Sequence, residues 1–512
     1  MKKIEINEKF KLALDTIENT DKHIFITGKA GTGKSTLLEY FRSKSKKKIV
    51  VLAPTGVAAL NVKGQTIHSF FRFRVDVTLE KIKKITSKDK NIYSELDAIV
   101  IDEISMVRAD LMDCIDKFLR INCGSVEPFG GKQMIFIGDL YQLPPVVNYK
   151  EREAFKNHYS SPYFFSSRVY NEIKLEMIEL DKIYRQTDEK FIDILNAIRN
   201  NSITNDMLDE LNKRLDIDFE PDIEDFYIWL TTKNDRAKEI NEERLAEVDE
   251  EEHIFNAEIY GDFNESSFPN DEELVLKVGS QVMFLNNDSE GEWVNGTIGN
   301  ITYIDEGEGV IYVELMDGDE VEVVPYTWEL FNYKFNAEER TIETESVGSF
   351  TQYPIKLAWA ITIHKSQGKT FEKIILDIGS GTFAPGQMYV GLSRCTSLKG
   401  LVLKKEISKK NIFMDWNVVK FMTGFQYDKS EDEMSFENKV KLIEDAIKTK
   451  SKLNITYLKP NDIKSLRTIE PYSIGEMNYM GKTFIGIEGY CLERRDVRNF
   501  RVDRILEMRV VE

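Results

Sequence analysis

The sequence of 512 residues contains only four cysteines, at positions 114, 123, 395 and 491, and no Cys-x-x-Cys pair. This scarcity argues against a disulfide framework and against zinc or iron–sulfur sites built from cysteine, and it suits a reducing cytosol. The five histidines show no His-Glu-x-x-His spacing, which argues against the metalloprotease motif that has this pattern.

Long hydrophobic runs are also missing. A membrane-spanning helix needs about 18 or more apolar residues in a row, and the longest candidate, residues 49–62, is interrupted by Pro54, Thr55 and Gly56. The N-terminal sequence MKKIE becomes charged again too soon for a secretory signal. We therefore expect a cytoplasmic protein without a membrane partner.

Basic residues are scarce in one block of the chain. The formal net charge of −18 by itself argues against a polyanionic partner. Residues 201–350, however, hold 9 Lys and Arg against 40 Asp and Glu. The net charge of this block is therefore −31, and that of the other 362 residues is +13. Because the acid is concentrated in one block, the total charge does not exclude nucleic acid.

The first 150 residues predict an α/β domain. Short apolar runs, typical of buried parallel strands, each end in a polar or glycine-rich turn, and a helical pattern over residues 35–42 separates the first two. This alternation favours a parallel sheet covered on both faces, with ligands at the carboxyl ends of its strands. The predicted strands are Ile24–Thr27, Ile49–Ala53, Ala98–Asp102 and Met134–Gly138.

The remaining sequence predicts a second α/β domain, an insertion and a tail. Residues 165–215 look helical, with Phe191, Leu195 and Ile198 on one face. Short β-type runs with turn signals predict a small antiparallel barrel over residues 279–350. A charged stretch, residues 428–433, is interpreted as a linker to the tail. Further strands are predicted at Tyr227–Thr231, Leu357–Thr362, Ile374–Ile378 and Leu401–Leu403.

Residues 28–35, GKAGTGKS, fit the pattern G-x-x-x-x-G-K-[ST]. Glycines let such a loop wrap a phosphate with its backbone N–H groups, and the following helix adds the positive end of its dipole. Lys34 would face the β- and γ-phosphates, and the Ser35 hydroxyl would ligate Mg²⁺. The pattern predicts a nucleoside-triphosphate site whose contacts are Gly28, Gly31, Thr32, Gly33, Lys34, Ser35 and Thr36.

Five further residues suit hydrolysis. One carboxylate is needed near the metal and another to orient or deprotonate water, and Asp102 and Glu103, at the end of a predicted strand, fit these two roles. Gln142 follows another strand and is placed to contact the γ-phosphate. Arginine best stabilises the negative charge that develops during phosphoryl transfer. Arg185 and Arg394 are the candidates for this role, although composition alone would make each an ordinary surface residue.

Taken in order, these segments resemble a superfamily 1B DNA helicase of the PIF type (petite integration frequency), a family related to RecD. The resemblance runs from Phe25 to about Leu403, and residues 109–120 occupy the place of the family's signature helix. The segments similar to motifs I, Ia, II, III, IV, V and VI are residues 28–36, 53–60 with 65–71, 102–106, 138–145, 180–199, 359–370 and 387–394.

The resemblance implies two RecA-like domains, with ATP and Mg²⁺ between them and single-stranded DNA across their top. It places the first domain at residues 1–175, the second at 176–278 and 351–427, and an inserted Src-homology-3-like barrel at 279–350. It also implies a nucleotide contact at Gly368. The expected function is an ATP-dependent DNA helicase that moves 5′ to 3′ on single strands and unwinds tailed duplex DNA.

The family's DNA path maps onto several motif residues. Hydroxyls and backbone N–H groups hold phosphates without reading sequence, while an aromatic residue such as Phe70 offers a base a stacking face. Core packing of Phe70 and Phe71 is an equally good interpretation. Residues 72–90 lie where the family keeps its strand-separating wedge. The other residues expected to line the path are Pro54, Thr55, Gly56, His68, Thr362, His364 and Ser366.

The sequence departs from the family pattern in two places. Residues 6–14 contain no glutamine, which the family often uses to read adenine, so strict ATP preference stays open. The signature helix matches only loosely, which leaves a RecD-like subgroup open.

The tail, residues 434–512, is similar to the WYL domain of bacterial regulators, a small Sm/Src-homology-3-like barrel associated with nucleic-acid or nucleotide ligands. The name-giving Trp-Tyr-Leu is replaced by Ile485-Gly486-Ile487. Arg498, Arg501 and Arg504 would form a phosphate-binding face; the alternative is a solvated basic surface that only packs on the motor.

Two other functions stay open: a single-strand DNA translocase that separates duplex poorly, and a DNA-stimulated ATPase regulated by a ligand of the WYL domain. Whichever function applies, the helicase included, we expect a monomeric, nucleoid-associated bacterial protein that works beside replication or repair proteins.

Overall fold

The computed structural model describes residues 6–74, 77–85, 91–148, 151–186, 188–222, 225–263, 265–336, 338–339, 341–479 and 481–511. The chain divides into two compact units, Met1–Ile198 with Thr204–Phe413, and Arg199–Ile203 with Met414–Glu512. Within the described part of the chain, no helix is long and apolar enough to cross a membrane.

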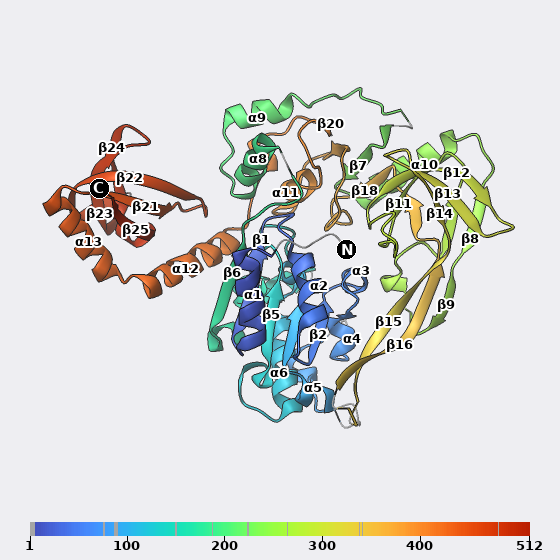
Figure 1. Ribbon diagram of the computed structural model, residues 1–512, viewed down its shortest axis with the longest axis horizontal. Coiled ribbons are helices and arrows are strands. Elements are labelled where there is room, and N and C mark those ends of the chain that lie inside the picture. Colours follow the sequence, from blue (N-terminus) through green and yellow to red (C-terminus); the bar gives the residue numbers. More distant parts are fainter. Residues whose placement is uncertain are drawn as a thin grey trace. The chain divides into compact units, whose positions relative to one another are not determined.

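The first domain of the larger unit is built on a six-stranded parallel sheet in the order β3-β2-β4-β5-β1-β6 (Figure 1). Alternate residues of β1 are buried on opposite faces: Ile24 and Ile26 pack with residues of α1 and α2, while the ring of Phe25 contacts Phe164, 5.8 Å away. The strands are β1 His23–Gly28, β2 Ile49–Ala53, β3 Gln65–Thr66, β4 Ala98–Ile101, β5 Gln133–Ile137 and β6 Leu175–Leu180.

The helices of this domain are short, apart from those that cover the sheet. The Asn7 side chain caps α1 by accepting the N–H of Phe10 at 2.9 Å. The helices are α1 Glu8–Asn19, α2 Lys34–Lys44, α3 Gly56–Asn61, α4 Ile67–Phe70, α5 Asn91–Glu95, α6 Ala109–Cys123 and α7 Arg152–Lys156.

The helical prediction for residues 165–215 is wrong over its first half. Strand β6 pairs with β1 along six residues and bears Leu175, Ile178 and Leu180 as its buried side chains. The first sheet therefore extends to residue 180, beyond the predicted domain boundary at 175. The helical face does exist further on, since Phe191, Leu195 and Ile198 are buried on α8.

The second domain contains a four-stranded parallel sheet in the order β18-β7-β19-β20. Its strands are β7 Ile228–Thr231, β18 Ala360–Thr362, β19 Ile374–Asp377 and β20 Leu401–Leu403. The predicted strand 357–362 is divided, because Ile355–Leu357 forms β17 and pairs with β11 of the insertion instead. The helices of the domain are α8 Glu189–Arg199, α9 Asn205–Asn212, α10 Asn234–Glu247 and α11 Gln387–Leu392.

The insertion is an antiparallel sheet in the order β14-β13-β12-β11-β17. Its apolar core includes Leu274 and Leu276 at one end of the segment and Tyr353 and Ile355 at the other, so it exceeds the predicted limits of 279–350 on both sides. The strands are β11 Gln281–Phe284, β12 Ile298–Asp305, β13 Val310–Leu315 and β14 Glu320–Val323, with β10 Glu273–Leu276 paired to β8 His253–Asn256.

A long two-stranded arm, β15 Tyr326–Asn336 with β16 Thr341–Gln352, leaves the insertion and reaches the first domain beside α5 (Figure 1). Strand β9 Glu258–Gly261 pairs with β16 at its base. At the far end the hydroxyl of Tyr333 accepts the N–H of Val51 at 3.0 Å, and Gln65 Nε2 donates to Asn332 Oδ1 at 2.5 Å. The arm therefore covers the edge of β2 that the two-residue strand β3 leaves open.

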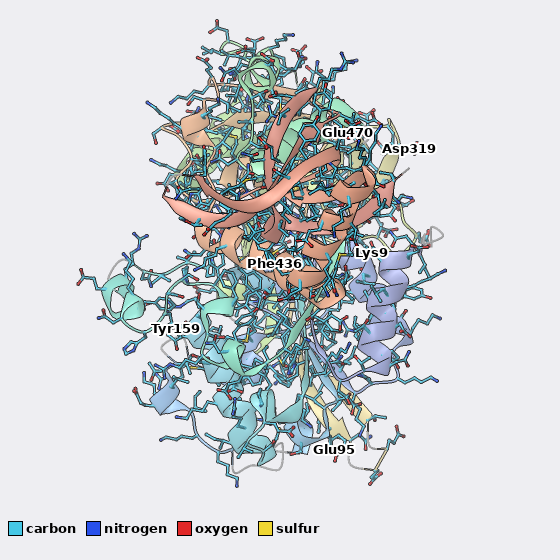
Figure 2. All side chains as sticks on the ribbon, turned by 90° about the vertical axis from the view of Figure 1, so that its left-hand side faces the viewer. Lys9, Glu95, Tyr159, Asp319, Phe436 and Glu470 are labelled. Carbon is cyan, nitrogen blue, oxygen red and sulfur yellow. The ribbon has the colours of Figure 1, made fainter. Side chains whose placement is uncertain are left out.

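The smaller unit combines two helices with an antiparallel sheet in the order β24-β23-β22-β21-β25. Helix α13 packs its apolar face on the sheet, with Phe436 (Figure 2) at the edge of this core. The elements are α12 Trp416–Glu433, α13 Phe436–Thr449, β21 Lys452–Leu458, β22 Lys464–Tyr479, β23 Lys482–Cys491, β24 Asp496–Arg501 and β25 Ile505–Val511.

The predicted linker at residues 428–433 is wrong, because this stretch is the last part of α12. Its charged residues are mostly exposed, while Ser430 is buried and donates to the carbonyls of Ile505 and Leu506 at 3.1 and 2.6 Å. The main segment of the smaller unit therefore begins at Met414 and includes α12, so the predicted end of the second domain at 427 is too late.

Candidate nucleotide and DNA site

The loop between β1 and α2 has the shape that a phosphate needs. Gly31 and Gly33 adopt φ values of +77° and +84°, and a Cβ on Gly31 would lie 2.5 Å from the Cβ of Arg185. Lys34, the first residue of the 11-residue helix α2, donates from Nζ to the carbonyls of Gly28 and Lys29 at 2.9 and 3.1 Å. Its ammonium group thus lies against the loop at the positive end of the helix dipole.

The hydroxyl residues of the loop divide into two roles. Thr32 is buried, and its hydroxyl donates to the carbonyl of Lys29 at 2.9 Å, so this side chain closes the loop instead of facing a ligand as predicted. Ser35 is exposed on the first turn of α2, and Thr36 is half-buried. Only the Ser35 hydroxyl therefore has the exposure that a metal ligand needs.

Asp102 and Glu103 follow β4 directly, and Glu103 has a left-handed backbone with φ of +49°. Both side chains keep some solvent contact, yet the surrounding protein is dense and removes most of their hydration. Burial raises the pKa of Asp102, against the lowering effect of its backbone hydrogen bond and of Lys34. Burial, followed by the charge of Asp102, raises the pKa of Glu103 to about 7.

Gln142 lies beside these carboxylates and contacts a residue that the sequence did not single out. Gln367, on the turn after β18, donates from Nε2 to Glu103 Oε2 at 2.9 Å and to Gln142 Oε1 at 3.2 Å. A glutamine on a turn carries no signal of its own in a sequence. Its role depends on the second domain facing the first.

The two predicted arginines, Arg185 between β6 and α8 and Arg394 just after α11, reach the same cleft. Arg185 donates to the carbonyls of Ser393 and Gly368 at 3.3 and 3.1 Å, and burial lowers its pKa to about 10. Arg394 is 1% exposed, and burial followed by the charge of Arg185 lowers its pKa to about 9. Both guanidinium groups still carry charge at neutral pH.

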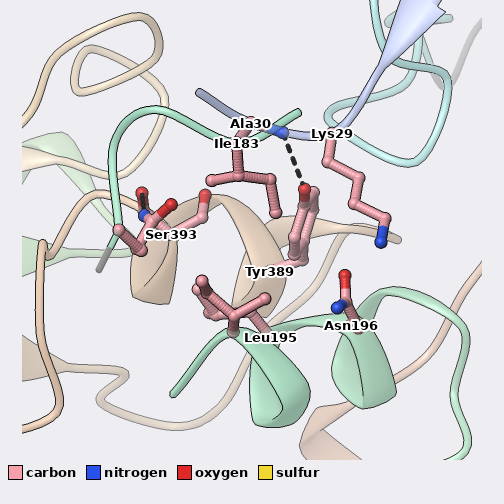
Figure 3. Close-up of a pocket in the computed structure, with 9 residues that line it drawn as sticks. Lys29, Ala30, Ile183, Leu195, Asn196, Tyr389 and Ser393 are labelled. Atoms are coloured by element: carbon pink, nitrogen blue, oxygen red, sulfur yellow. Dashed lines mark hydrogen bonds between the residues drawn. The ribbon is translucent and has the colours of Figure 1, made fainter. Parts of the chain in front are cut away.

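A small pocket beneath the loop joins the two domains (Figure 3). The hydroxyl of Tyr389, on α11, accepts the N–H of Ala30 at 2.9 Å, and the side chains of Lys29 and Asn196 lie at its open side. Gln186 Nε2 donates to the carbonyls of Ser393 and Cys395 at 3.0 and 3.1 Å. These contacts fix the loop of the first domain against α11, which carries the motif VI sequence.

The predicted DNA residues of the first domain are only partly accessible. Thr55 is exposed, and Pro54 and His68 are half-buried, whereas Gly56 is buried under Ser267. The prediction for Phe70 is wrong: the ring is 4% exposed and packs edge-on against Phe71 and Tyr93, at 4.9 and 5.3 Å. Phe70 therefore belongs to a buried aromatic cluster beneath the arm, which confirms the interpretation of core packing.

The predicted DNA residues of the second domain lie on the turn that carries Gln367. His364 is half-buried and stacks on Phe383 with the ring centroids 5.9 Å apart. Thr362 is buried, and the prediction for Ser366 is wrong because its side chain is fully buried and its hydroxyl donates to the Ile363 carbonyl at 2.8 Å. Ser366 therefore shapes the turn. Of the wedge segment 72–90, residues 75–76 and 86–90 lie outside the described residues.

Two lysines beside this turn were missed by the sequence analysis. Burial, followed by the charge of Lys356, lowers the pKa of Lys369 to about 7, and burial followed by the charge of Lys365 lowers that of Lys356 to about 8. Neither forms an ion pair within the described part of the chain, and Lys369 donates to Asn295 Oδ1 of the insertion. Lys365 itself is exposed. Three cations with few acids are thus gathered near the turn.

The basic residues predicted for the smaller unit are partly neutralised. Arg501 binds Asp503 through two hydrogen bonds of 3.0 and 2.5 Å and lies over the ring of Phe484, while Arg498 lies 3.9 Å from Asp496. A different cluster, Lys459, Arg467 and Arg494, forms no ion pair among the described residues. Burial and then the charges of the two arginines lower the pKa of Lys459.

A glycine-rich loop on one parallel sheet, with Arg185 from the segment after β6 and Arg394 from the second α/β domain at the same cleft, defines a P-loop nucleoside-triphosphate motor of two RecA-like domains. The model of the PIF1-like helicase family matches residues 5–208, and that of the WYL domain matches residues 438–510. The ATP-dependent DNA helicase Pif1 of Bdellovibrio bacteriovorus is 33% identical over 437 residues, covering 83% of this chain and 93% of the relative. The chain belongs to the PIF1-like helicase family.

Solved structures agree with this assignment. The structure of Bacteroides sp. Pif1 in complex with ADP-AlF4 is 38% identical, with a TM-score of 0.78, and the match covers 83% of this chain and 98% of that chain. Bacteroides Pif1 bound to single-stranded DNA has the same identity and coverage, with a TM-score of 0.61. The TM-score is thus higher for the ADP-AlF4 complex, and for unliganded Bacteroides sp. Pif1 at 0.76, than for the complex with single-stranded DNA.

Proposed function

We propose that this protein is an ATP-dependent DNA helicase that moves 5′ to 3′ on single-stranded DNA and unwinds tailed duplex DNA. The observation that carries the proposal is the convergence at one cleft of Lys34, the carboxylates after β4, and the guanidinium groups of Arg185 and Arg394. Opening and closing of such a cleft with each nucleotide is what moves a motor of this class along a strand.

In this proposal each residue acts on a defined part of the reaction. Lys34 and the loop N–H groups bind the β- and γ-phosphates, and Glu103 takes the proton of the attacking water. Because the pKa of Glu103 is about 7, a large part of it is ionised at neutral pH and able to accept that proton. Arg185 and Arg394 stabilise the charge on the transferred phosphoryl group.

The residues at the cleft fit Mg²⁺ bound together with a nucleotide. Magnesium in such sites is held by one or two protein oxygens and by the phosphates themselves, and it neutralises the charge between the β- and γ-phosphates. Ser35 and Asp102 supply a hydroxyl and a carboxylate. The described residues contain no group of three or more His, Cys, Asp or Glu that would hold a metal without the nucleotide.

The DNA strand is proposed to lie along Thr55, His68, His364 and the lysines beside the turn 362–368. Lysine side chains bind phosphates independently of sequence, as a translocating motor requires. Lys356, Lys365 and Lys369 supply this charge close to the acidic insertion.

The smaller unit is proposed to add affinity for DNA through Lys459, Arg467 and Arg494. The supporting observation is that these cations lie together and form no ion pair with any carboxylate that the structure describes, whereas Arg501 is held by Asp503. We further propose that the protein acts in the cytoplasm as a monomer. Light scattering of the purified protein would test the monomeric state.

The decisive experiment uses forked duplexes that carry either a 5′ or a 3′ single-stranded tail. We expect unwinding that requires ATP and occurs only with the 5′ tail. Unwinding from the 3′ tail alone would contradict the proposed direction. Translocation along single strands without duplex separation would favour the alternative of a translocase.

A further inference from the structure

The side chain of Gln367 crosses the cleft from the second domain to the first. Its Nε2 donates to Glu103 Oε2 at 2.9 Å and to Gln142 Oε1 at 3.2 Å, so both N–H bonds of the amide are used. The opposite orientation of the amide would place its oxygen against the Glu103 carboxylate. The charge of Glu103 therefore fixes which end of the amide faces the first domain.

These two hydrogen bonds set the orientation of both partners. Gln142 is held by its oxygen. Among the described residues, its own Nε2 contacts Asp139 Oδ2 at the long distance of 3.5 Å, a weak contact that a phosphate oxygen could displace. Glu103 is held through one carboxylate oxygen, which leaves the other for water. Gln367 thus orients two groups without occupying the place of the reacting atoms.

Gln367 is carried by a turn with little freedom to deform. Within residues 362–368, the N–H of Ser366 donates to the carbonyl of Thr362 at 3.0 Å and that of Gln367 to His364 at 3.2 Å. Arg394 Nη1 donates to the carbonyls of Ser366 and Lys369 at 3.4 and 3.2 Å. A force on one side of this turn therefore moves the whole of it, including the Gln367 amide.

The same turn bears His364 and Lys365, which the proposed function places on the DNA path. We propose that Gln367 is a positioning residue that couples DNA on the turn 362–368 to hydrolysis, by holding Glu103 and Gln142 in their working orientations. This inference rests on the proposed function and deepens it. Gln367 acts only through its two partners.

The test compares ATP hydrolysis by the full chain with and without single-stranded oligonucleotide. Losing a hydrogen bond to a charged group corresponds to a factor of about 10 to 100. For Gln367→Ala we expect kcat with saturating oligonucleotide to fall by about this factor, toward the basal rate. KM for ATP and the Kd for the oligonucleotide should change by no more than about twofold.

A matched control is Gln352→Ala in the arm. This buried amide also donates two hydrogen bonds, to the carbonyls of Phe255 and Glu272 at 2.9 and 3.4 Å, but lies outside the cleft. Its loss should lower thermal stability and leave the stimulation by DNA intact. A second variant, Gln367→Glu, keeps the side-chain length, so it retains the fold while removing the donor, and it should lose the stimulation as Gln367→Ala does.

Three results would overturn the inference. If wild-type hydrolysis responds to DNA and both Gln367 variants respond equally, Gln367 has no coupling role, while the proposed function stands. If wild-type hydrolysis does not respond to DNA at all, the inference and the proposed function fail together. If Gln352→Ala lost as much kcat as Gln367→Ala, the effect would be assigned to lower stability and not to coupling.

Discussion

Replacement of Arg394 by alanine should abolish hydrolysis while leaving nucleotide binding nearly intact. The guanidinium is 1% exposed and donates to the carbonyls of Val390, Lys369 and Ser366 at 2.8, 3.2 and 3.4 Å, and to the hydroxyl of Ser393 at 2.9 Å. It therefore both holds the turn of the second domain and places a positive charge at the cleft.

The expected losses of activity and of stability follow from these two roles of Arg394. An arginine that stabilises phosphoryl transfer accelerates the reaction by a factor of about 10³ to 10⁵. This factor corresponds to roughly 4–7 kcal/mol of the activation free energy of the chemical step. Truncation also removes the guanidinium donor from three carbonyls, of which those of Val390 and Ser366 keep the Ser393 hydroxyl and the Lys369 N–H as donors. Breaking a buried charged network costs roughly 3–5 kcal/mol of unfolding free energy. We therefore expect a loss of activity larger than the loss of stability explains.

Three measurements separate the two effects. Steady-state hydrolysis at saturating oligonucleotide gives the rate, a fluorescent nucleotide gives the affinity, and thermal unfolding gives the stability. Arg394→Lys keeps one positive charge, so it should be more stable than Arg394→Ala and still hydrolyse slowly, since lysine cannot reproduce the planar fork. A folded Arg394→Ala protein with wild-type turnover would remove Arg394 from the mechanism.

Other predictions concern the loop, the lysines and the smaller unit. Lys34→Ala should abolish hydrolysis because the loop loses its cation, and unchanged turnover would refute the nucleotide site. The pKa of Lys369, about 7, means that its ammonium loses its proton as the pH rises through neutrality. Affinity for single-stranded DNA should therefore fall between about pH 6 and pH 8.5, and less steeply in Lys369→Met; equal slopes would exclude this lysine from the DNA path. In the smaller unit, replacing Lys459, Arg467 and Arg494 together by alanine should weaken DNA binding at low salt with basal hydrolysis unchanged, whereas unchanged affinity would favour a unit that only packs.

Local sequence patterns were sufficient to predict the parts of the fold that depend on neighbouring residues. The strand 49–53 was predicted to the residue, and the glycine-rich loop was found from its spacing alone. Such features need only a few adjacent residues, because a buried parallel strand must be apolar on both faces and a phosphate loop must bend at fixed positions.

Features that depend on distant contacts were missed or misjudged. Phe70 follows a motif that suggests DNA, but its environment is decided by Tyr93 and by the arm, which lies far away in sequence. The charged stretch 428–433 reads as a linker, yet it is helical because Ser430 contacts strand β25. Gln367 gains its role only when two domains meet, which no local pattern reports.

The arm has a mechanical consequence. The insertion is encoded within the second domain, yet Tyr333 and Asn332 fasten its far end to the sheet edge of the first. A change in the width of the cleft must therefore bend the arm or detach its tip. The register shift between Leu330 and Phe331 is the irregular point at which a paired ribbon can flex. The insertion is thus tied to both domains, so the paired ribbon has to accommodate any change in the distance between them.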